Sequence, residues 1–181
     1  MVYDYNMKQI PSTFFESKTL KVAPELLGKY LARKIGNKIV REKITETEAY
    51  VGPCDLACHS SRGKTERNKI MFYEASTIYV YFTYGMHWML NIVTENGCGA
   101  AILIRGTEHY KGPAILTKAL RIDKNLNGKK LGRKSGLWIE PGSKIENRKL
   151  KISRLPRVGI SYAGKIWANK PYRFILKRPI P

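Results

Sequence analysis

Three short runs of β-branched and aromatic residues, separated by tight turns, constrain the fold of this chain more than any other sequence feature. They span residues 77–83, 87–94 and 100–104, and glycine-containing turns at 84–85 and 96–97 interrupt them. β-Branched and aromatic side chains favour strands, and glycine permits the backbone conformations that tight turns need. Because connections this short join antiparallel neighbours, the pattern predicts an antiparallel meander.

The residues before this meander predict a helix and then a hairpin. The helix is expected at residues 22–27, with Pro24 in its first turn and Gly28 as its stop. Strand-like runs at 29–35 and 39–50 follow, separated by a Gly-Asn dipeptide that favours a hairpin turn. We therefore expect two antiparallel strands ahead of the meander.

After the meander, the sequence predicts one more helix at residues 114–122 and two late strands at 155–162 and 172–176. Residues 55–73 show no periodicity and are rich in Lys and Arg, which is typical of a long functional loop. The length of 181 residues fits one domain spanning residues 1–181. The predicted fold class is α+β, with a curved, mainly antiparallel β-sheet surrounded by helices and a protruding β-hairpin.

The chain is strongly basic. Thirty-three Lys and Arg residues against fourteen Asp and Glu leave a net charge of +19 and an isoelectric point near 10.0. Such an excess repels itself in a compact state, and a polyanionic partner relieves this repulsion while counterion release contributes to the affinity. Charge alone does not separate DNA, RNA and an anionic membrane, but the composition favours a nucleic acid.

Two features indicate the compartment. No stretch approaches the roughly 18 apolar residues of a membrane helix, and the N-terminus has no signal-peptide core. Three cysteines cannot all pair within one chain, which favours a reducing environment. We therefore expect a soluble protein of the cytoplasm that does not bind a membrane.

Two glutamates in the second strand-like run are candidates for acid–base chemistry. Strand alternation places Glu46, Glu48 and Tyr50 on one face, with the two carboxylates about 7 Å apart. This proximity raises carboxylate pKa values, and burial against an aromatic ring raises them further, which gives a base suited to neutral pH. A solvated acidic edge and the carboxylate pair of a sugar hydrolase are alternatives that the residues alone leave open.

Aromatic side chains cluster in the first strand of the meander and at its turn. Tyr79 and Tyr81 share one face, whereas Phe82 and Tyr84 take the other. Tyr79 and Phe82 are expected in the core. Tyr84 lies at a hairpin tip, where a large exposed aromatic indicates an interaction surface. In a polycationic protein, such a side chain fits a wedge that enters a base step of DNA.

The sequence disfavours a metal site and a covalent nucleophile. Cys54, Cys58 and His59 superficially resemble zinc ligands, but a structural zinc site needs four ligands and no second Cys/His pair follows. Neither a Gly-x-Ser-x-Gly elbow nor a phosphate-binding Gly-x-x-x-x-Gly-Lys-Ser/Thr loop occurs. No lysine is singled out as a Schiff-base former.

Several sequence blocks together resemble the alkyladenine (3-methyladenine) DNA glycosylase family. The most specific are Glu-Thr-Glu-Ala-Tyr at 46–50 and Tyr-Val-Tyr-x-x-Tyr-Gly-Met at 79–86, at their mutual spacing. Further matching positions are Gly52-Pro53, Ala57, His59-Ser60, Arg67-Asn68, Met71-Phe72, Asn91-Ile92, Leu103, Arg105, Gly112-Pro113, Leu116, Ala119-Leu120, Arg157-Val158-Gly159, Ala163-Gly164, Trp167-Ala168 and Lys170-Pro171. The resemblance extends from about residue 14 to residue 174.

The resemblance implies catalytic roles for two residues. Glu48 matches the general base that activates a water molecule, and Glu46 is then a neighbour rather than the base. Arg105 matches the residue that holds the water and the backbone near the glutamate.

The resemblance also implies a pocket for the damaged base. Tyr50, His59 and Tyr81 match its walls, with a flipped purine stacked between the two tyrosines. Asn91 matches an amide at the pocket edge that discriminates against purines bearing an exocyclic 2-amino group. Tyr84 matches the side chain that intercalates into the gap left in the base stack.

The implied function is that of a monofunctional DNA glycosylase in base excision repair. The enzyme would flip alkylated or deaminated purines, such as 3-methyladenine, hypoxanthine and ethenoadenine, out of duplex DNA and leave an abasic site. Its partner is double-stranded DNA containing damaged purines, it works as a monomer, and it uses no metal and no organic cofactor. The composition further suggests a prokaryotic protein associated with the nucleoid.

A non-enzymatic DNA- or RNA-binding protein is the alternative from a different class. Architectural binders use a basic surface and an apolar wedge without any catalytic carboxylate. Glu48 separates the two hypotheses, because a pure binder has no use for an acidic residue that repels phosphate.

Overall fold

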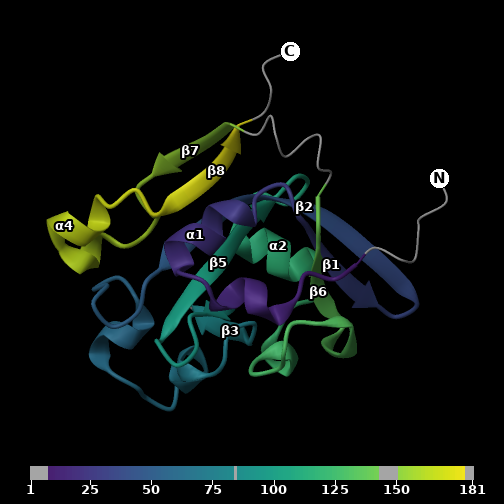
Figure 1. The fold of residues 1–181 in the computed structure, drawn as a ribbon, viewed down its shortest axis with the longest axis horizontal. Helices are drawn as coiled ribbons and strands as arrows, with labels where there is room; N and C mark the ends of the chain where they lie inside the picture. Colours follow the sequence, from purple (N-terminus) through teal and green to yellow (C-terminus); the bar gives the residue numbers. More distant parts are fainter. Residues whose placement is uncertain (1–7, 84, 143–150, 178–181) are drawn as a thin grey trace.

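The computed structural model of the protein describes residues 8–83, 85–142 and 151–177 (Figure 1). Within these residues, eight strands form one sheet. The strands are β1 (Tyr30–Ile35), β2 (Lys38–Tyr50), β3 (Ile78–Thr83), β4 (His87–Thr94), β5 (Ala100–Thr107), β6 (Leu137–Glu140), β7 (Lys151–Leu155) and β8 (Arg173–Lys177). The α-helices of the described residues are α1 (Thr19–Glu25), α2 (Pro113–Ala119) and α4 (Gly164–Ala168). Their 3-10 helices are η1 (Ser12–Glu16), η2 (His59–Arg62), η3 (Lys69–Phe72), η4 (Lys124–Leu126), η5 (Arg133–Ser135) and η6 (Ser161–Ala163).

The strands are paired antiparallel throughout the described part of the chain. The order is β3-β4-β5-β2-β1-β6, and β8 pairs with both β2 and β7. The long strand β2 pairs with β1 in its first half and with β5 and β8 in its second half. Register shifts between Ile44 and Thr47 separate the two halves, and such irregularities bend a strand. The predicted α+β class with a curved antiparallel sheet is confirmed.

The predicted meander and the first hairpin are also confirmed. β3 pairs with β4, β4 pairs with β5, and β1 pairs with β2 across a turn in which Gly36 has a φ of +59°. The helix expected at residues 114–122 is present as α2. Tyr84, at the tip of the β3–β4 hairpin, lies outside the described residues. The protrusion of this hairpin therefore stays a prediction.

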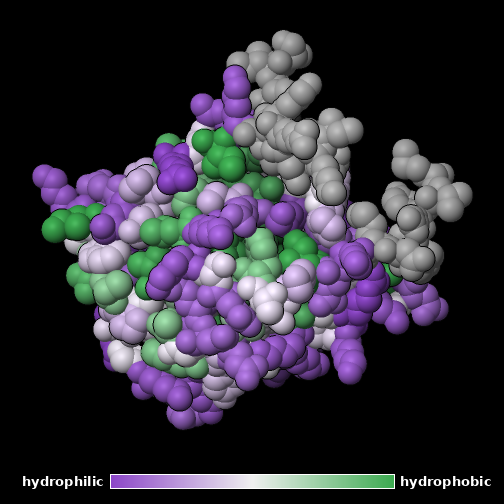
Figure 2. Space-filling model, viewed as in Figure 1, coloured by the Kyte–Doolittle hydropathy of each residue, from purple (hydrophilic) through white to green (hydrophobic). Residues whose placement is uncertain are grey.

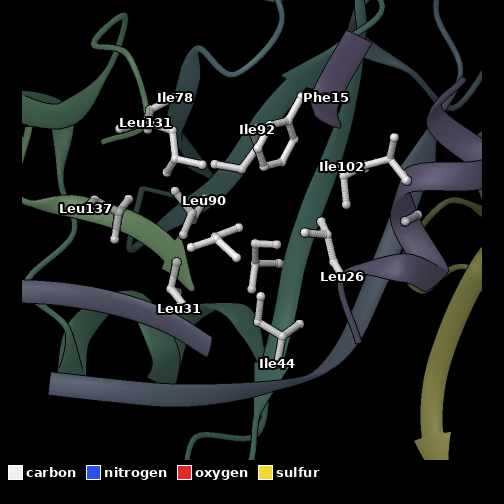
Figure 3. Packing of buried hydrophobic residues seen from close by; sticks show 14 of the residues in the cluster. Phe15, Leu26, Leu31, Ile44, Ile78, Leu90, Ile92, Ile102, Leu131 and Leu137 are labelled. Carbon is white, nitrogen blue, oxygen red and sulfur yellow. The ribbon is translucent and has the colours of Figure 1, made fainter. Parts of the chain in front are cut away.

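One face of the sheet carries the main hydrophobic core (Figure 3). Strand alternation turns Ala49 of β2, Ile92 of β4 and Ile102 of β5 to this face, where all three are fully buried. Residues of α1 and α2 pack into the same cluster. Burying a side chain the size of leucine or isoleucine stabilises the fold by about 1.5–3 kcal/mol. The core therefore holds β2, β4 and β5 together and leaves their opposite face available for a site.

The first helix differs from the prediction. α1 begins at Thr19, and Pro24 lies in its last turn instead of its first. The helix begins early because Glu95, in the β4–β5 loop, accepts hydrogen bonds from the backbone N–H and the hydroxyl of Thr19 at 2.8 and 2.7 Å. A helix start held by a residue this distant in sequence leaves no local pattern.

The strand predicted at residues 155–162 is wrong. β7 ends at Leu155, and the chain continues through a loop and η6 into α4. The cause is tertiary, because Arg157 forms a buried ion pair and the backbone N–H of Val158 donates to a side chain instead of a neighbouring strand. The strand predicted at 172–176 is confirmed as β8.

Two smaller departures concern buried positions. β6, whose residues are all buried beside β1, is missing from the sequence-based prediction. Phe82, predicted in the core, is 43% exposed and packs against Trp88 with ring centroids 4.6 Å apart. Tyr79, by contrast, is buried as predicted.

Candidate active site

A single row of residues crosses the sheet on the face opposite the main core. Strand register pairs each member of this row with the next one across β3, β4, β5, β2 and β8. Directly paired residues of antiparallel strands have neighbouring side chains on the same face. The members of the row are Tyr79, Asn91, Leu103, Glu48 and Arg173.

Alternation along the strands adds three more side chains to this face. Tyr50, Tyr81 and Arg105 are each two positions from a member of the row. Tyr50 and Tyr81 pack against one small cluster that contains Cys58 and Tyr79. The sheet thus brings residues from the two specific sequence blocks, 46–50 and 79–86, into one place.

Glu48 is fully buried, with 0% of its surface exposed. Its Oε2 accepts a hydrogen bond from the Tyr50 hydroxyl at 3.0 Å, and its Oε1 accepts one from the backbone N–H of Val158 at 2.9 Å. Burial raises the pKa of the Glu48 carboxyl above its ordinary value, while the charge of Arg105 and these two hydrogen bonds limit the rise. The result is a carboxylate with an increased tendency to take up a proton, as a general base requires.

Arg105 is shared between two carboxylates. Its Nε lies 2.9 Å from Oε1 of Glu46 and 3.6 Å from Oε1 of Glu48. Glu46 also accepts a hydrogen bond from Arg173 at 3.1 Å. Because the closer contact of Arg105 is with Glu46, the charge of the buried Glu48 is only partly compensated.

Arg157 supports the site from the loop that follows β7. Both of its terminal nitrogens donate hydrogen bonds to Asp55, one of them at 2.8 Å, and its guanidinium lies 4.7 Å from the ring centroid of Tyr50. Burial, and then the charge of Glu48, raise the pKa of Tyr50 well above its ordinary value, so the hydroxyl stays a donor. Val158 follows Arg157 directly, and these contacts therefore hold its N–H against Glu48.

His59, Tyr79 and Tyr81 form an aromatic group at the other end of the row. The rings of His59 and Tyr81 meet edge to face at 4.5 Å, and Nδ1 of His59 lies 3.0 Å from the Tyr79 hydroxyl. Burial lowers the pKa of His59, and the nearby charge of Arg67 lowers it further, so the imidazole is neutral at pH 7. Nδ2 of Asn91 donates to the Tyr79 carbonyl at 3.2 Å. Aromatic faces beside neutral polar groups suit a flat heterocycle.

A surface pocket of about 400 Å³ opens beside His59. Its lining residues include Leu56, Arg62 and Arg67 of the 55–73 loop and Tyr162 of η6. No carboxylate occurs among its described lining residues. Figure 1 places this loop and α4 at the same end of the molecule. The pocket has the size of a small-molecule site and the charge to accept an anionic ligand.

The structure therefore groups the predicted site residues that it describes. These are Glu48, Arg105, Tyr50, His59, Tyr81 and Asn91. Tyr84 lies outside the described residues. Among the described residues, no group of three or more His, Cys, Asp or Glu is arranged to hold a metal ion.

Sequence reasoning missed the groups that hold Glu48 in place. The N–H of Val158 and the Asp55–Arg157 pair reach the site from distant parts of the chain. A backbone donor has no residue-type signature, because every residue except proline carries one. The only sign of this segment was the Arg-Val-Gly block within the family resemblance.

Comparison with known proteins places this chain in a family. The model of the methylpurine-DNA glycosylase family matches residues 13–111 and 107–179. A protein of Legionella pneumophila (strain Corby) is 45% identical over 94% of this chain and 96% of its own length. A relative from Methanocella arvoryzae is 39% identical over 93% of this chain and 92% of its own length. A relative from Myxococcus xanthus is 40% identical over 92% of this chain and 89% of its own length. All three are provisionally named 3-methyladenine DNA glycosylases.

The chain belongs to the methylpurine-DNA glycosylase family and is thus a DNA glycosylase, a hydrolase of N-glycosyl bonds. The resemblance seen in the sequence is confirmed. No helix in the described part of the chain is long and apolar enough to cross a membrane.

Proposed function

We propose that this protein excises alkylated and deaminated purines, including 3-methyladenine-like lesions, hypoxanthine and ethenoadenine, from duplex DNA through a water molecule activated by Glu48. One observation carries the proposal. Glu48 is fully buried beside the aromatic residues of the site, with a raised pKa and a nearest cation that lies closer to Glu46. Burying a carboxylate whose charge is only partly compensated costs folding free energy, and carboxylates perturbed in this way cluster at functional sites.

The chemical step is a hydrolysis. A water oxygen bonds to C1′ of the extruded nucleotide as the N-glycosidic bond breaks, and the electron pair of that bond leaves with the purine. Glu48 takes the water proton and counters the positive charge that develops on the sugar. Arg105 orients the water and keeps Glu48 ionised, because a nearby cation favours the charged form of a carboxyl. The products are a free base and an abasic site.

The aromatic residues hold the extruded base. Tyr50 and Tyr81 stack on the purine, and His59 forms the pocket wall between them. The electron-rich faces of tyrosine attract the positive charge of an alkylated purine. Asn91 at the pocket edge rejects purines with a 2-amino group, and Tyr84 fills the gap left in the base stack.

The charge of the chain supports a DNA partner. A net charge of +19 draws the protein to the phosphate backbone of a duplex. We propose that it acts as a monomer on DNA in the cytoplasm of a prokaryote, at the nucleoid, and that it needs no metal or organic cofactor. For an alkylated purine that already carries a positive charge, water and one carboxylate supply the whole hydrolysis. A neutral base such as hypoxanthine must also gain a proton as it leaves.

The test uses a duplex oligonucleotide with one hypoxanthine or ethenoadenine, followed by alkaline cleavage of the abasic sites. Wild type should produce abasic sites that alkali cleaves, and Glu48→Gln should lose at least about a hundredfold in single-turnover rate, as expected for loss of a general base. Glu48→Gln should still bind the duplex. Glu66→Gln, a matched change at an exposed carboxylate, serves as the control.

Two results would contradict the proposal. Equal turnover by Glu48→Gln and wild type would remove Glu48 from the mechanism. Binding without excision by wild type, on methylated DNA as well as on these duplexes, would favour a non-enzymatic DNA-binding protein instead. Tyr84→Ala tests the wedge, because it should slow excision while non-specific binding, which depends on charge, is retained.

A further inference from the structure

The C-terminal arm, defined here as residues 151–177, has a charge balance unlike the rest of the chain. It contains seven Lys and Arg residues and no Asp or Glu. Arg157 and Arg173 form ion pairs with Asp55 and Glu46. The remaining basic residues of the arm form no ion pair with any carboxylate that the structure describes. The arm thus carries a surplus of positive charge.

The tip of this arm, formed by η6 and α4, also exposes large apolar side chains. Ile166 is 76% exposed and Tyr162 is 67% exposed. In the described part of the molecule, Met86 beside the β3–β4 turn is the only other large hydrophobic residue with a comparable exposed fraction, at 68%. Figure 2 shows hydrophobic residues at the end of the molecule where α4 lies in Figure 1, with hydrophilic residues around them.

The exposure at the tip does not come from loose packing. Trp167, the neighbour of Ile166 in α4, turns inward and meets Tyr172 of the arm with ring centroids 6.5 Å apart. The ammonium of Lys170 lies 4.8 Å from the Trp167 ring. Ala163 of η6 packs in a small buried cluster with residues outside the arm. The inner side of the tip is therefore fixed by packing, while Ile166 on its outer side is exposed, as is typical of an interaction surface.

The tip lies next to the candidate active site. The Tyr162 hydroxyl donates to the Ala57 carbonyl at 3.1 Å, and Tyr162 lines the same pocket as His59. The loop that leads to the tip carries the Val158 N–H that binds Glu48. A duplex whose nucleotide reaches Glu48 therefore passes close to Tyr162.

We propose that Tyr162, Lys165 and Ile166 form a second DNA contact, separate from the β3–β4 hairpin, on the duplex flanking the damaged nucleotide. This inference rests on the proposed function, because it takes duplex DNA as the ligand. Lys165 neutralises a backbone phosphate. Ile166 and Tyr162 lie against the sugars and base edges of the minor groove, where apolar side chains of DNA-binding proteins insert. The surplus charge of the arm favours this partner over another protein surface.

The experiment compares two double variants of the full chain. Lys165→Ala/Ile166→Ser alters the tip, and Lys118→Ala/Ile115→Ser makes the same two changes on α2. Ile115 is 58% exposed, and α2 packs on the core face of the sheet, away from Glu48. Both variants have the same net charge, so a loss confined to the tip variant reports the location of the contact. Thermal melting followed by circular dichroism checks that both are folded.

Binding is measured by fluorescence anisotropy with a duplex that carries an abasic-site analogue, at several salt concentrations. The tip variant should bind about tenfold more weakly than wild type, which corresponds to about 1.4 kcal/mol. Its plot of log affinity against log salt should be shallower by about 0.9, the value for one lost phosphate contact. The α2 variant should bind as wild type does.

Equal affinities of the tip variant and the α2 variant would overturn the inference. A wild-type dimer that the tip changes dissociate, without a change in DNA affinity, would also overturn it and assign the tip to self-association. Excision by the same samples separates this inference from the proposed function. If wild type binds the duplex but releases no base, the proposed function is wrong. The affinities of the tip variant and the α2 variant then still test the DNA contact.

Discussion

Asp55 and Glu48 are both fully buried carboxylates, but their surroundings differ. Asp55 receives two hydrogen bonds from the buried guanidinium of Arg157 and two more from backbone N–H groups, at 3.1 and 3.3 Å. Glu48 receives one from Tyr50 and one from a backbone N–H, and its nearest cation is the Nε of Arg105 at 3.6 Å.

This difference distinguishes a carboxylate that stabilises the fold from one that is suited to a chemical reaction. A buried carboxylate whose charge and hydrogen-bonding capacity are fully matched ties two loops together, and its loss leaves an unpaired buried cation. When the only nearby cation is distant and shared, the ionised form of a buried carboxylate is less stable and its pKa is raised. Carboxylates with such perturbed pKa values are found among reactive groups. The Asp55–Arg157 pair thus stabilises the frame that keeps Glu48 in this state.

The largest expected effect is that of Asp55→Asn on stability. This variant leaves Arg157 buried without its anion, so the free energy of unfolding should fall by about 3–5 kcal/mol. Urea denaturation measures the change. Asp55→Leu/Arg157→Met removes both charges and should be less destabilising than Asp55→Asn alone. If Asp55→Asn lowered the free energy of unfolding by less than about 1 kcal/mol, the Asp55–Arg157 pair would not be what stabilises this part of the fold.

Glu48→Gln should give the opposite result in the same denaturation experiment. Burial raises the pKa of Glu48 in the folded state, so ionising Glu48 lowers the stability of the fold. This cost is absent below the unfolded pKa and is complete once the pH has risen through the folded pKa. At pH 7, Glu48→Gln should therefore be at least as stable as wild type, and its advantage should disappear towards pH 4. A Glu48→Gln protein less stable than wild type at pH 7 would contradict this account of Glu48.

The pH dependence of excision gives a third measurement on the same carboxylate. Only ionised Glu48 accepts a proton, so the single-turnover rate should rise with pH, with a midpoint above about 4.3, the ordinary glutamate pKa. Arg105 is the largest influence that lowers the Glu48 pKa. Arg105→Gln should move the midpoint to higher pH, and Arg105→Lys should move it less. An unchanged midpoint in Arg105→Gln would mean that another group titrates.

The smallest expected effect belongs to an exposed carboxylate. Glu66 pairs with Lys69 at 2.6 Å on the surface, where solvent screens the interaction. Glu66→Gln should leave the urea midpoint and the excision rate unchanged within error. A measurable loss of stability would mean that burial is not what distinguishes Asp55 from other paired carboxylates.

The site was predictable from sequence wherever local rules apply. Strand alternation alone places Glu46, Glu48 and Tyr50 on one face. In the structure, Arg105 contacts both glutamates and Tyr50 donates a hydrogen bond to Glu48. Alternation also places Tyr79 and Tyr81 together on the site face of β3. Phe82 was misplaced because alternation tells two faces apart but does not say how much of each face is covered near the end of a strand.

The amino-acid sequence by itself determined the strands of the meander, the basic charge and the motif residues of the candidate site, because each depends on residue type and on neighbours a few positions away. Tertiary structure alone decided the row from Tyr79 to Arg173, the Asp55–Arg157 pair and the Val158 N–H that binds Glu48. These contacts join residues far apart in the chain, and strand register and buried pairing depend on packing the whole core at once. No local pattern carries that information.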